Sequence, residues 1–270
     1  MIRLVAAAAL ALGGCSAPEP APGPATGDRP TIVSLNPCAD AILAEVTAPG
    51  QLLAISHYSK DPRASSMEPD DAARYDATGG TVEEVLALDP DVVVASSFIG
   101  PATRSALTDL GIAVETVGSV GSVADSVAQV RQLAALTGDR TAGEALVARI
   151  ETAARPSEET PVDTVLWQSG GIVPGEATLV SELLARAGLA NGAAKRGLGQ
   201  ADYLSLETVL ADPPDLLLVA GSEQGQGHPA LAALPNTHIA RLDPNLVYCG
   251  GPTIPRAIAK LRALRKSVAS

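Results

Sequence analysis

Three cysteines and three histidines are the residues of this sequence best suited to redox or metal chemistry. Two of the cysteines, Cys38 and Cys249, stand just before or at predicted helix starts, where a helix N-terminus lowers the pKa of a thiol. A closed four-ligand metal site needs tighter clustering than the sequence shows. No Gly-x-x-x-x-Gly-Lys, Gly-x-Ser-x-Gly or His-Glu-x-x-His motif occurs. We therefore expect a binding protein rather than an enzyme, with no resident cofactor.

The third cysteine, Cys15, ends a segment that is typical of a bacterial export signal. Met1-Ile-Arg3 is a short basic start, and residues 4–12 form an apolar run too short to cross a bilayer. Leu12-Gly-Gly-Cys15 resembles a lipobox, in which the cysteine becomes the lipidated first residue; the alternative is an ordinary secretory signal. Residues 16–30, rich in Pro, Ala and Gly, predict a semi-extended tether. We expect residues 1–15 to be a signal peptide and the protein to be lipid-anchored at the periplasmic face of a bacterial membrane.

The composition excludes nucleic acid as a partner. The formal net charge is −11, whereas a surface that binds nucleic acid needs clustered Lys and Arg. The chain is 46% hydrophobic but only 2% aromatic, so its core must be aliphatic. With 270 residues, it is long enough for one large domain or for two lobes of ordinary size.

One stretch of the sequence occurs twice. Residues 81–95 align without a gap with residues 205–219, and the alignment places Glu83 on Glu207. Each copy has a hydroxyl residue that caps a short helix, a Pro-Asp turn, and an apolar run that predicts a buried strand. A strand that is apolar on both faces indicates a parallel sheet with helices on both sides. Because the copies lie far apart, they predict a duplicated domain of two similar α/β lobes.

Strands and helices alternate on both sides of a helical centre. The pattern predicts a first lobe over residues 31–138, with a long polar loop at 57–80, and a second lobe over residues 161–270. Residues 139–155 have the period of a helix, and about 15 helical residues span roughly 22 Å, enough to bridge two lobes. We therefore expect an α/β fold of two lobes with mostly parallel sheets flanked by helices, joined by one long backbone helix.

Several short motifs are similar to those of one family. Ile32-Val-Ser-Leu-Asn-Pro37, Tyr58-Ser-Lys-Asp-Pro62, both repeats and Gly250-Gly-Pro252 resemble the periplasmic substrate-binding proteins of ATP-driven (ABC) importers. The resemblance covers about residues 31–266, and the class has one backbone helix between two lobes and binds cobalamin or ferric siderophores. It implies a monomer that captures a metal chelate at the carboxyl ends of the strands and delivers it to an ABC permease. A bare transition-metal ion is the alternative ligand, and a chelate-processing enzyme on the same fold is a third hypothesis.

The resemblance also indicates which residues contact the ligand. Tyr58 matches an aromatic residue that contacts the corrin ring in cobalamin-binding relatives. Other pocket aromatics of those relatives are replaced here by Ala77, Ala201 and Ser169. Trp167 could line the pocket or sit in the core. The expected ligand-binding residues, all near predicted strand ends or the late loop, are Asn36, Cys38, Tyr58, Phe98, Trp167, Gln168, Tyr248 and Cys249.

The two cysteines and the cationic residues near the cleft edge each allow more than one interpretation. Cys38 and Cys249, one in each lobe, could form a disulfide across the cleft, which an oxidising compartment permits and which would clamp the lobes. They could instead touch a bound metal complex, assisted by His57 or His228, or be two small buried apolar residues. The cationic residues that could hold an anionic siderophore, or be ordinary surface, are Arg63, Arg74 and Arg196.

Glu83 and Glu207 match positions that meet permease arginines in cobalamin-binding relatives. Two equivalent carboxylates on two similar lobes could dock onto two equivalent permease subunits, so the expected partner is a permease dimer. The alternative is that each carboxylate is favourable near a helix N-terminus through the helix dipole alone.

Overall fold

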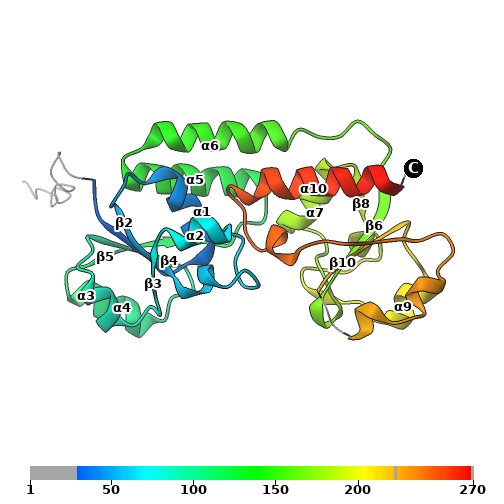
Figure 1. The fold of residues 1–270 in the computed structure, drawn as a ribbon, viewed down its shortest axis with the longest axis horizontal. Coiled ribbons are helices and arrows are strands. Elements are labelled where there is room, and N and C mark those ends of the chain that lie inside the picture. Colours follow the sequence, from blue (N-terminus) through cyan, green and yellow to red (C-terminus); the bar gives the residue numbers. More distant parts are fainter. Residues whose placement is uncertain (1–28, 222–223, 269–270) are drawn as a thin grey trace, which may run out of the picture.

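The computed structural model describes residues 29–221 and 224–268. The expected lipid attachment site, Cys15, and residues 16–28 of the expected tether lie outside the described residues. The described chain forms two lobes, each built on a parallel sheet flanked by helices, and three long helices run along one side of the molecule (Figure 1). The predicted α/β fold with two sheet-containing lobes is confirmed.

The first lobe has a five-stranded parallel sheet in the order β3-β2-β1-β4-β5. Ile32 of the central β1 pairs with Leu52 of β2 on one side and with Val92 of β4 on the other. Its strands are β1 (Ile32–Ser34), β2 (Leu52–Ser56), β3 (Asp76–Thr78), β4 (Val92–Ser96) and β5 (Ala113–Val117), and its helices are α1 (Pro37–Val46), α2 (Pro69–Ala73), α3 (Val82–Ala87) and α4 (Pro101–Asp109).

The second lobe has a four-stranded parallel sheet in the order β11-β10-β6-β8. A short antiparallel pair, β7 (Ile172–Val173) with β9 (Asp202–Tyr203), follows the carboxyl end of β6. The sheet consists of β6 (Val162–Gln168), β8 (Leu189–Asn191), β10 (Leu216–Ala220) and β11 (His238–Arg241), and the helices are α7 (Leu179–Arg186), α8 (Gly192–Lys195) and α9 (Leu206–Ala211).

The two repeats have the same local structure. Thr81 caps α3 by accepting the Glu84 N–H at 3.2 Å, and Ser205 caps α9 by accepting the Thr208 N–H at the same distance. The apolar runs that follow are β4 and β10, and β10 is buried along its whole length. Each repeat therefore supplies a helix and an interior strand at the same place in its lobe.

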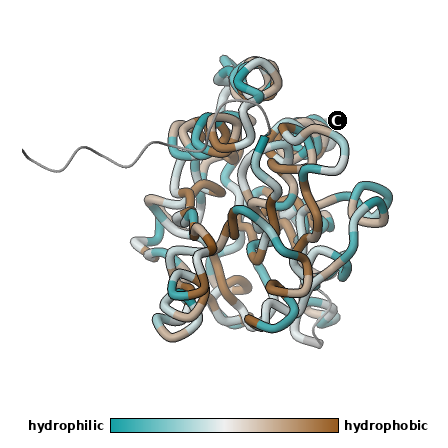
Figure 2. Tube along the Cα trace, turned by 90° about the vertical axis from the view of Figure 1, so that its left-hand side faces the viewer, coloured by the Kyte–Doolittle hydropathy of each residue, from teal (hydrophilic) through white to brown (hydrophobic). Residues whose placement is uncertain are grey.

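Buried apolar side chains form one shared core and two separate ones. The largest cluster runs from Ile32 of β1 through Leu133 and Ile150 in the long helices to Leu166 of β6. The opposite face of each sheet has its own cluster under the repeat helix, with Val85 in the first lobe and Val209 in the second. Figure 2 shows hydrophobic segments concentrated in the interior. The lobes are thus held together by continuous packing against the long helices.

Three long helices lie along one side of the described part of the chain. They are α5 (Val123–Thr137), α6 (Arg140–Ala153) and α10 (Thr253–Val268). The predicted bridging segment, 139–155, contains α6, which packs against α5, α1 and α10. The other two long helices, α5 and α10, lie beside it (Figure 1). None of the described helices is both long and apolar enough to cross a membrane.

The polar segment 57–80, predicted as a loop, contains three short elements: a 3-10 turn, η1 (His57–Lys60), and then α2 and β3. The Lys60 ammonium donates to the carbonyls of Ala72 and Tyr75 at 2.6 and 2.5 Å and so fixes the end of α2. The edge strand β3 is largely exposed, so it lacks the apolar pattern by which interior strands are predicted.

Candidate functional site

A cavity of about 220 Å³ lies between the two lobes. Residues at or just after the carboxyl ends of β1, β4 and β5 line its first-lobe side, and residues at the start of α7 line the second-lobe side. In parallel sheets this carboxyl edge is where ligands bind. The lining residues are Asn36, Cys38, Ser96, Gly118, Ser119, Val120, Gln129, Thr178, Leu179, Val180, Gln200, Val247 and Tyr248.

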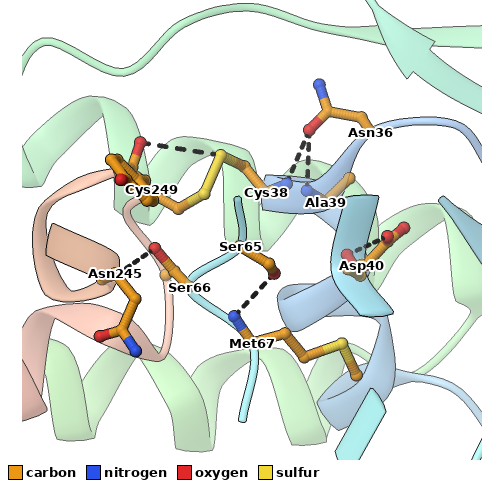
Figure 3. The surroundings of a disulfide bond; sticks show 12 residues. Asn36, Cys38, Ala39, Asp40, Ser65, Ser66, Met67, Asn245 and Cys249 are labelled. Atoms are coloured by element: carbon orange, nitrogen blue, oxygen red, sulfur yellow. Dashed lines mark hydrogen bonds between the residues drawn. A yellow bond between two sulfur atoms is a disulfide. The ribbon is translucent and has the colours of Figure 1, made fainter. Parts of the chain in front are cut away.

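The first turn of α1 forms one wall of this cavity. The Asn36 side-chain oxygen Oδ1 caps the helix by accepting the N–H groups of Cys38 and Ala39 at 2.9 and 3.1 Å (Figure 3). Because Oδ1 is committed to the helix end, the polar group that Asn36 can offer to a ligand is its amide Nδ2.

Cys38 and Cys249 form a disulfide, with their Cα atoms 5.3 Å apart. Of the three alternatives that the sequence leaves open, the structure has the disulfide, so neither residue is a free thiol. The bond does not join the outer parts of the lobes, because the segment that carries Cys249 already rests on the first lobe and α5. The Ser66 hydroxyl donates to the Asn245 carbonyl at 2.5 Å (Figure 3). The Gly251 N–H donates to the Ser126 hydroxyl of α5 at 2.7 Å. The disulfide therefore fixes Tyr248 beside the first-lobe wall of the cavity.

Tyr248 is half-exposed and contributes a neutral phenol. Partial burial, and secondarily the nearby negative charge of Asp243, raise the pKa of Tyr248. A raised pKa favours the protonated form, so this residue offers an aromatic face and a hydroxyl group rather than a phenolate.

His57 and Tyr58 form a second group beyond the carboxyl end of β2. Their ring centroids are 4.1 Å apart, and both side chains are exposed. The Nδ1 atom of His57 lies 3.3 Å from the Thr78 carbonyl oxygen. Since a carbonyl only accepts, this contact places the proton of a neutral ring on Nδ1 and leaves a lone pair on Nε2. Histidines that bind metals commonly donate one ring N–H to a carbonyl in this way and leave the other nitrogen free for the metal.

Four of the other expected residues lie outside the inter-lobe cavity. Phe98 follows β4 and is 80% exposed, and Gln168 is partly buried at the end of β6. Trp167 is buried in the second-lobe core and donates its indole N–H to the Leu204 carbonyl at 2.9 Å. It borders a separate cavity of about 250 Å³, together with Tyr203 and Glu207. Cys249 is buried behind the wall.

Several cavity residues are absent from the expected set. Residues 118–120 follow β5, so the rule that points to other strand ends would have found them. The same rule does not find Gln200 or the residues at the start of α7, because neither follows a strand of the parallel sheets directly. Glycine-rich turns bring both to the cavity, and tertiary packing sets the course of those turns.

The candidate cationic residues are engaged elsewhere. Their ion pairs are Arg63 with Asp61 at 3.0 Å, Arg74 with Asp71 at 3.0 Å, and Arg196 with Asp212 at 2.9 Å. His228 accepts the Ala230 N–H through Nδ1 and so stabilises its own loop. Among residues 29–221 and 224–268, no group of three or more His, Cys, Asp or Glu side chains is placed to hold a metal ion.

Glu83 and Glu207 occupy the exposed first turns of α3 and α9. Figure 1 shows both helices on the side of their lobes away from the long helices. The backbone N–H of Glu207 and the Ser205 hydroxyl hold the pKa of the Glu207 carboxyl below its ordinary value.

A family model described as periplasmic binding protein matches residues 32–246. This match covers most of the chain and includes every strand of both parallel sheets. The chain belongs to this family. No curated protein sequence matches it.

Solved structures of periplasmic binding proteins share this fold. The heme-binding protein HutB of Vibrio cholerae has a TM-score of 0.70 and 20% identity, over 87% of this chain and 98% of that one. The heme-binding protein RhuT of Roseiflexus sp. RS-1 has a TM-score of 0.69 and 23% identity, over 90% and 100%. The vitamin B12-binding protein BtuF of Vibrio cholerae has a TM-score of 0.66 and 18% identity, over 89% and 98%. At these identities the likeness establishes the fold.

Proposed function

We propose that this protein captures a metal-bearing tetrapyrrole, a heme or a corrinoid, between its lobes and delivers it to an ABC permease. The family supplies the transport role, and similar structures include proteins that bind heme or vitamin B12. A cavity of about 220 Å³ is smaller than ordinary small-molecule pockets of about 300–1,000 Å³. A tetrapyrrole would therefore extend from the cavity onto its rim.

The exposed aromatic side chains carry this proposal. The chain has only four tyrosines, one phenylalanine and one tryptophan. Four of these are exposed: Tyr58, Phe98 and Tyr248 follow β2, β4 and β11 of the two parallel sheets, and Tyr203 lies in the short strand β9. A protein that is poor in aromatics gains nothing in stability by leaving them in water, so we interpret these exposed rings as ligand contacts. Flat aromatic faces suit a flat conjugated ring.

The polar groups beside these rings suit a metal at the centre of such a ring. His57 presents Nε2, and its ring is held by the Thr78 carbonyl. The neutral hydroxyl of Tyr248 and the amide of Asn36 can donate hydrogen bonds to polar substituents at the ring edge. In this arrangement the tetrapyrrole nitrogens hold the metal and the protein adds one axial ligand, so no cluster of protein ligands is needed.

A ferric siderophore is the second candidate, and the charges favour it less. Siderophore complexes that are anionic need cations in the cleft. The three arginines best placed in sequence instead form ion pairs with aspartates. The choice between the two ligands rests on this difference between aromatic and cationic surface.

Delivery would use the two repeat helices and the N-terminal anchor. We propose that Glu83 and Glu207 meet cationic side chains of a permease dimer, because both are exposed and lie on the same side of the molecule. Cys15 would carry the lipid anchor at the periplasmic face of the membrane. A monomer presents both glutamates to one permease without a further interface.

Titration of the purified protein with heme, followed by the heme absorbance, tests this proposal. We expect saturation at one heme per protein. Tyr58→Ala and Tyr248→Ala should each weaken binding about tenfold or more through lost ring contact. Leu110→Ala is the matched control, because Leu110 is an exposed apolar residue at the far end of α4. Unchanged affinity in both tyrosine variants would place the ligand elsewhere.

A further inference from the structure

A buried carboxylate lies directly beneath the His57–Tyr58 pair. Asp40, in the first turn of α1, has no exposed surface. Its Oδ2 atom accepts the backbone N–H of Ser56 at 2.9 Å and the hydroxyl of Ser59 at 2.6 Å. Ser56 and Ser59 are the residues on either side of the pair. One carboxylate oxygen therefore holds both ends of the segment that presents His57 and Tyr58 to the cleft.

The remaining contacts make this segment dependent on Asp40. Lys60 and the His57 ring contact backbone carbonyls of Ala72 and Thr78, which lie further along the same lobe. Asp40 holds η1 from the side of α1, the helix that is capped by Asn36 and carries the disulfide. Figure 3 shows Asp40 in the same turn as Asn36, Cys38 and Ala39.

We propose that Asp40 is a positioning residue for ligand binding, whose protonation state controls how firmly His57 and Tyr58 are held at the cleft. This inference rests on the proposed function. When the segment opens, water reaches the carboxylate, and when it closes, the carboxylate returns to a site with two hydrogen-bond donors on one oxygen. The other oxygen, Oδ1, is buried there without a hydrogen bond of ordinary geometry. A negative charge is thus better accommodated in the open segment.

The direction of the pH effect follows from this environment. Burial raises the pKa of Asp40 from 3.8 to about 7, and outweighs the hydrogen bonds with Ser34, Ser59 and Ser56. The closed form therefore binds a proton more tightly than the open form. The closed segment is most favoured at low pH, and this preference falls as the pH rises towards 7, by up to about tenfold per pH unit.

No other charge produces this shift. The charged and titratable groups on the surrounding elements bind other partners. His57 contacts the Thr78 carbonyl, and Lys60 binds the carbonyls of Ala72 and Tyr75. Glu45 pairs with Arg149 of α6, Arg131 of α5 pairs with Glu144, and Asp125 of α5 accepts the Gly121 N–H. Asp40→Asn keeps an oxygen acceptor and the side-chain size but cannot ionise. It therefore isolates the titration from loss of the contact.

Hydrogen exchange of the Ser56 amide between pH 5 and 8, corrected for the intrinsic rate, reads the segment without any ligand. In the wild type we expect protection of Ser56 to fall as the pH rises, while protection of the core amide of Val93 falls less. In Asp40→Asn the pH dependence of Ser56 protection should disappear. Thr47→Ala, which removes a hydroxyl hydrogen bond at the other end of α1, should behave as the wild type. Equal pH dependence in the wild type and Asp40→Asn would overturn the inference.

Heme titration over the same pH range supplies the second measurement. Wild-type affinity should fall with rising pH by a larger factor than that of Asp40→Asn. Suppose that Ser56 hydrogen exchange behaves as expected but the wild type and Asp40→Asn lose heme affinity equally as the pH rises. Asp40 then holds the segment but does not affect ligand binding, and the inference is wrong. If no tetrapyrrole binds the wild type at any pH, the proposed function fails, whereas the exchange result still decides whether Asp40 controls the segment.

Discussion

The two lobes share a repeat but hold their cleft edges in different ways. In the first lobe, a disulfide and the buried Asp40 fasten the edge to α1. In the second lobe, the edge is glycine-rich and folds closely on itself. Gly171 has φ +74, and a Cβ atom there would lie 2.5 Å from the Tyr203 ring. The same helix–strand scaffold therefore supports one edge held by cross-links and one held by close backbone packing.

Because of this difference, we expect the two duplicated lobes to contribute unequally to ligand binding. The cross-linked edge holds Tyr58 and Tyr248 in place before a ligand arrives, which lowers the entropy lost on binding.

The repeat helices differ too. Glu84 follows Glu83 and binds Thr78 and Gly80, whereas Thr208 stands at its position in the second copy. There the Glu207 carboxylate itself accepts hydrogen bonds from its own backbone N–H and the Ser205 hydroxyl, which lower the pKa of Glu207.

Removing both carboxylates that we propose for docking should have the largest effect. Glu83→Ala combined with Glu207→Ala should reduce uptake to background in cells that depend on this protein, with ligand affinity unchanged, because neither residue lines the inter-lobe cavity. Among single variants, Glu83→Ala should cost more, since Glu207 must give up contacts with its own helix end to dock. Glu151→Ala, an exposed glutamate of α6, is the control. A loss of affinity in the double variant would place these residues in the binding site.

Removing the disulfide should be the next largest effect. The bond joins residues 211 positions apart, and losing a cross-link of this kind costs about 2–5 kcal/mol of unfolding free energy. Cys38→Ser with Cys249→Ser, measured by urea unfolding, tests this. Heme affinity should also fall, because Tyr248 loses its attachment to α1. Tighter binding after reduction would show that the bond holds the cleft shut, contrary to the geometry.

Two glycines at the cleft edges provide a matched pair. In Gly175→Ala, the new Cβ would lie 1.9 Å from the Leu198 carbonyl oxygen, whereas Gly118 has open space around it. We expect Gly175→Ala to destabilise the protein by about 1–3 kcal/mol through forced backbone movement, and Gly118→Ala to have little effect. Thermal unfolding of the two variants measures the difference. Equal stabilities would mean that the second edge is not closely packed.

The helix caps of the repeats should give the smallest and most similar effects. Thr81→Ala and Ser205→Ala each remove one side-chain acceptor from a helix start, which costs about 1 kcal/mol. Urea unfolding should show losses that agree within error. A much larger loss in one copy would show that its hydroxyl has a further role.

The repeats and both lobes could be predicted from the sequence because they depend on local patterns. The apolar runs of β4 and β10, and the hydroxyl caps before α3 and α9, are visible in a few consecutive residues. Pro37 stands at the start of α1 and Pro101 at the start of α4, as the fixed geometry of proline favours.

The cleft depends on contacts between distant segments, so much of it could not be predicted. Cys38 pairs with Cys249 only because the chain before α10 crosses back to the first lobe, which no local pattern indicates. Asp40 looks like an ordinary helix residue until Ser56 and Ser59 are placed above it. Trp167 illustrates the opposite case, since either outcome suited its position at a strand end, and the Leu204 carbonyl places it in the core.

The ligand class is tested most directly by calorimetric titration of the purified protein with four ligands under one set of conditions. These are heme, cyanocobalamin, a ferric hydroxamate siderophore and free ferrous or zinc ions. Our prediction is that one site binds heme or cyanocobalamin at least about tenfold more tightly than the siderophore, a difference of about 1.4 kcal/mol, with no response to the free ions. Tight binding of the siderophore or of a bare ion, with neither tetrapyrrole bound, would contradict it.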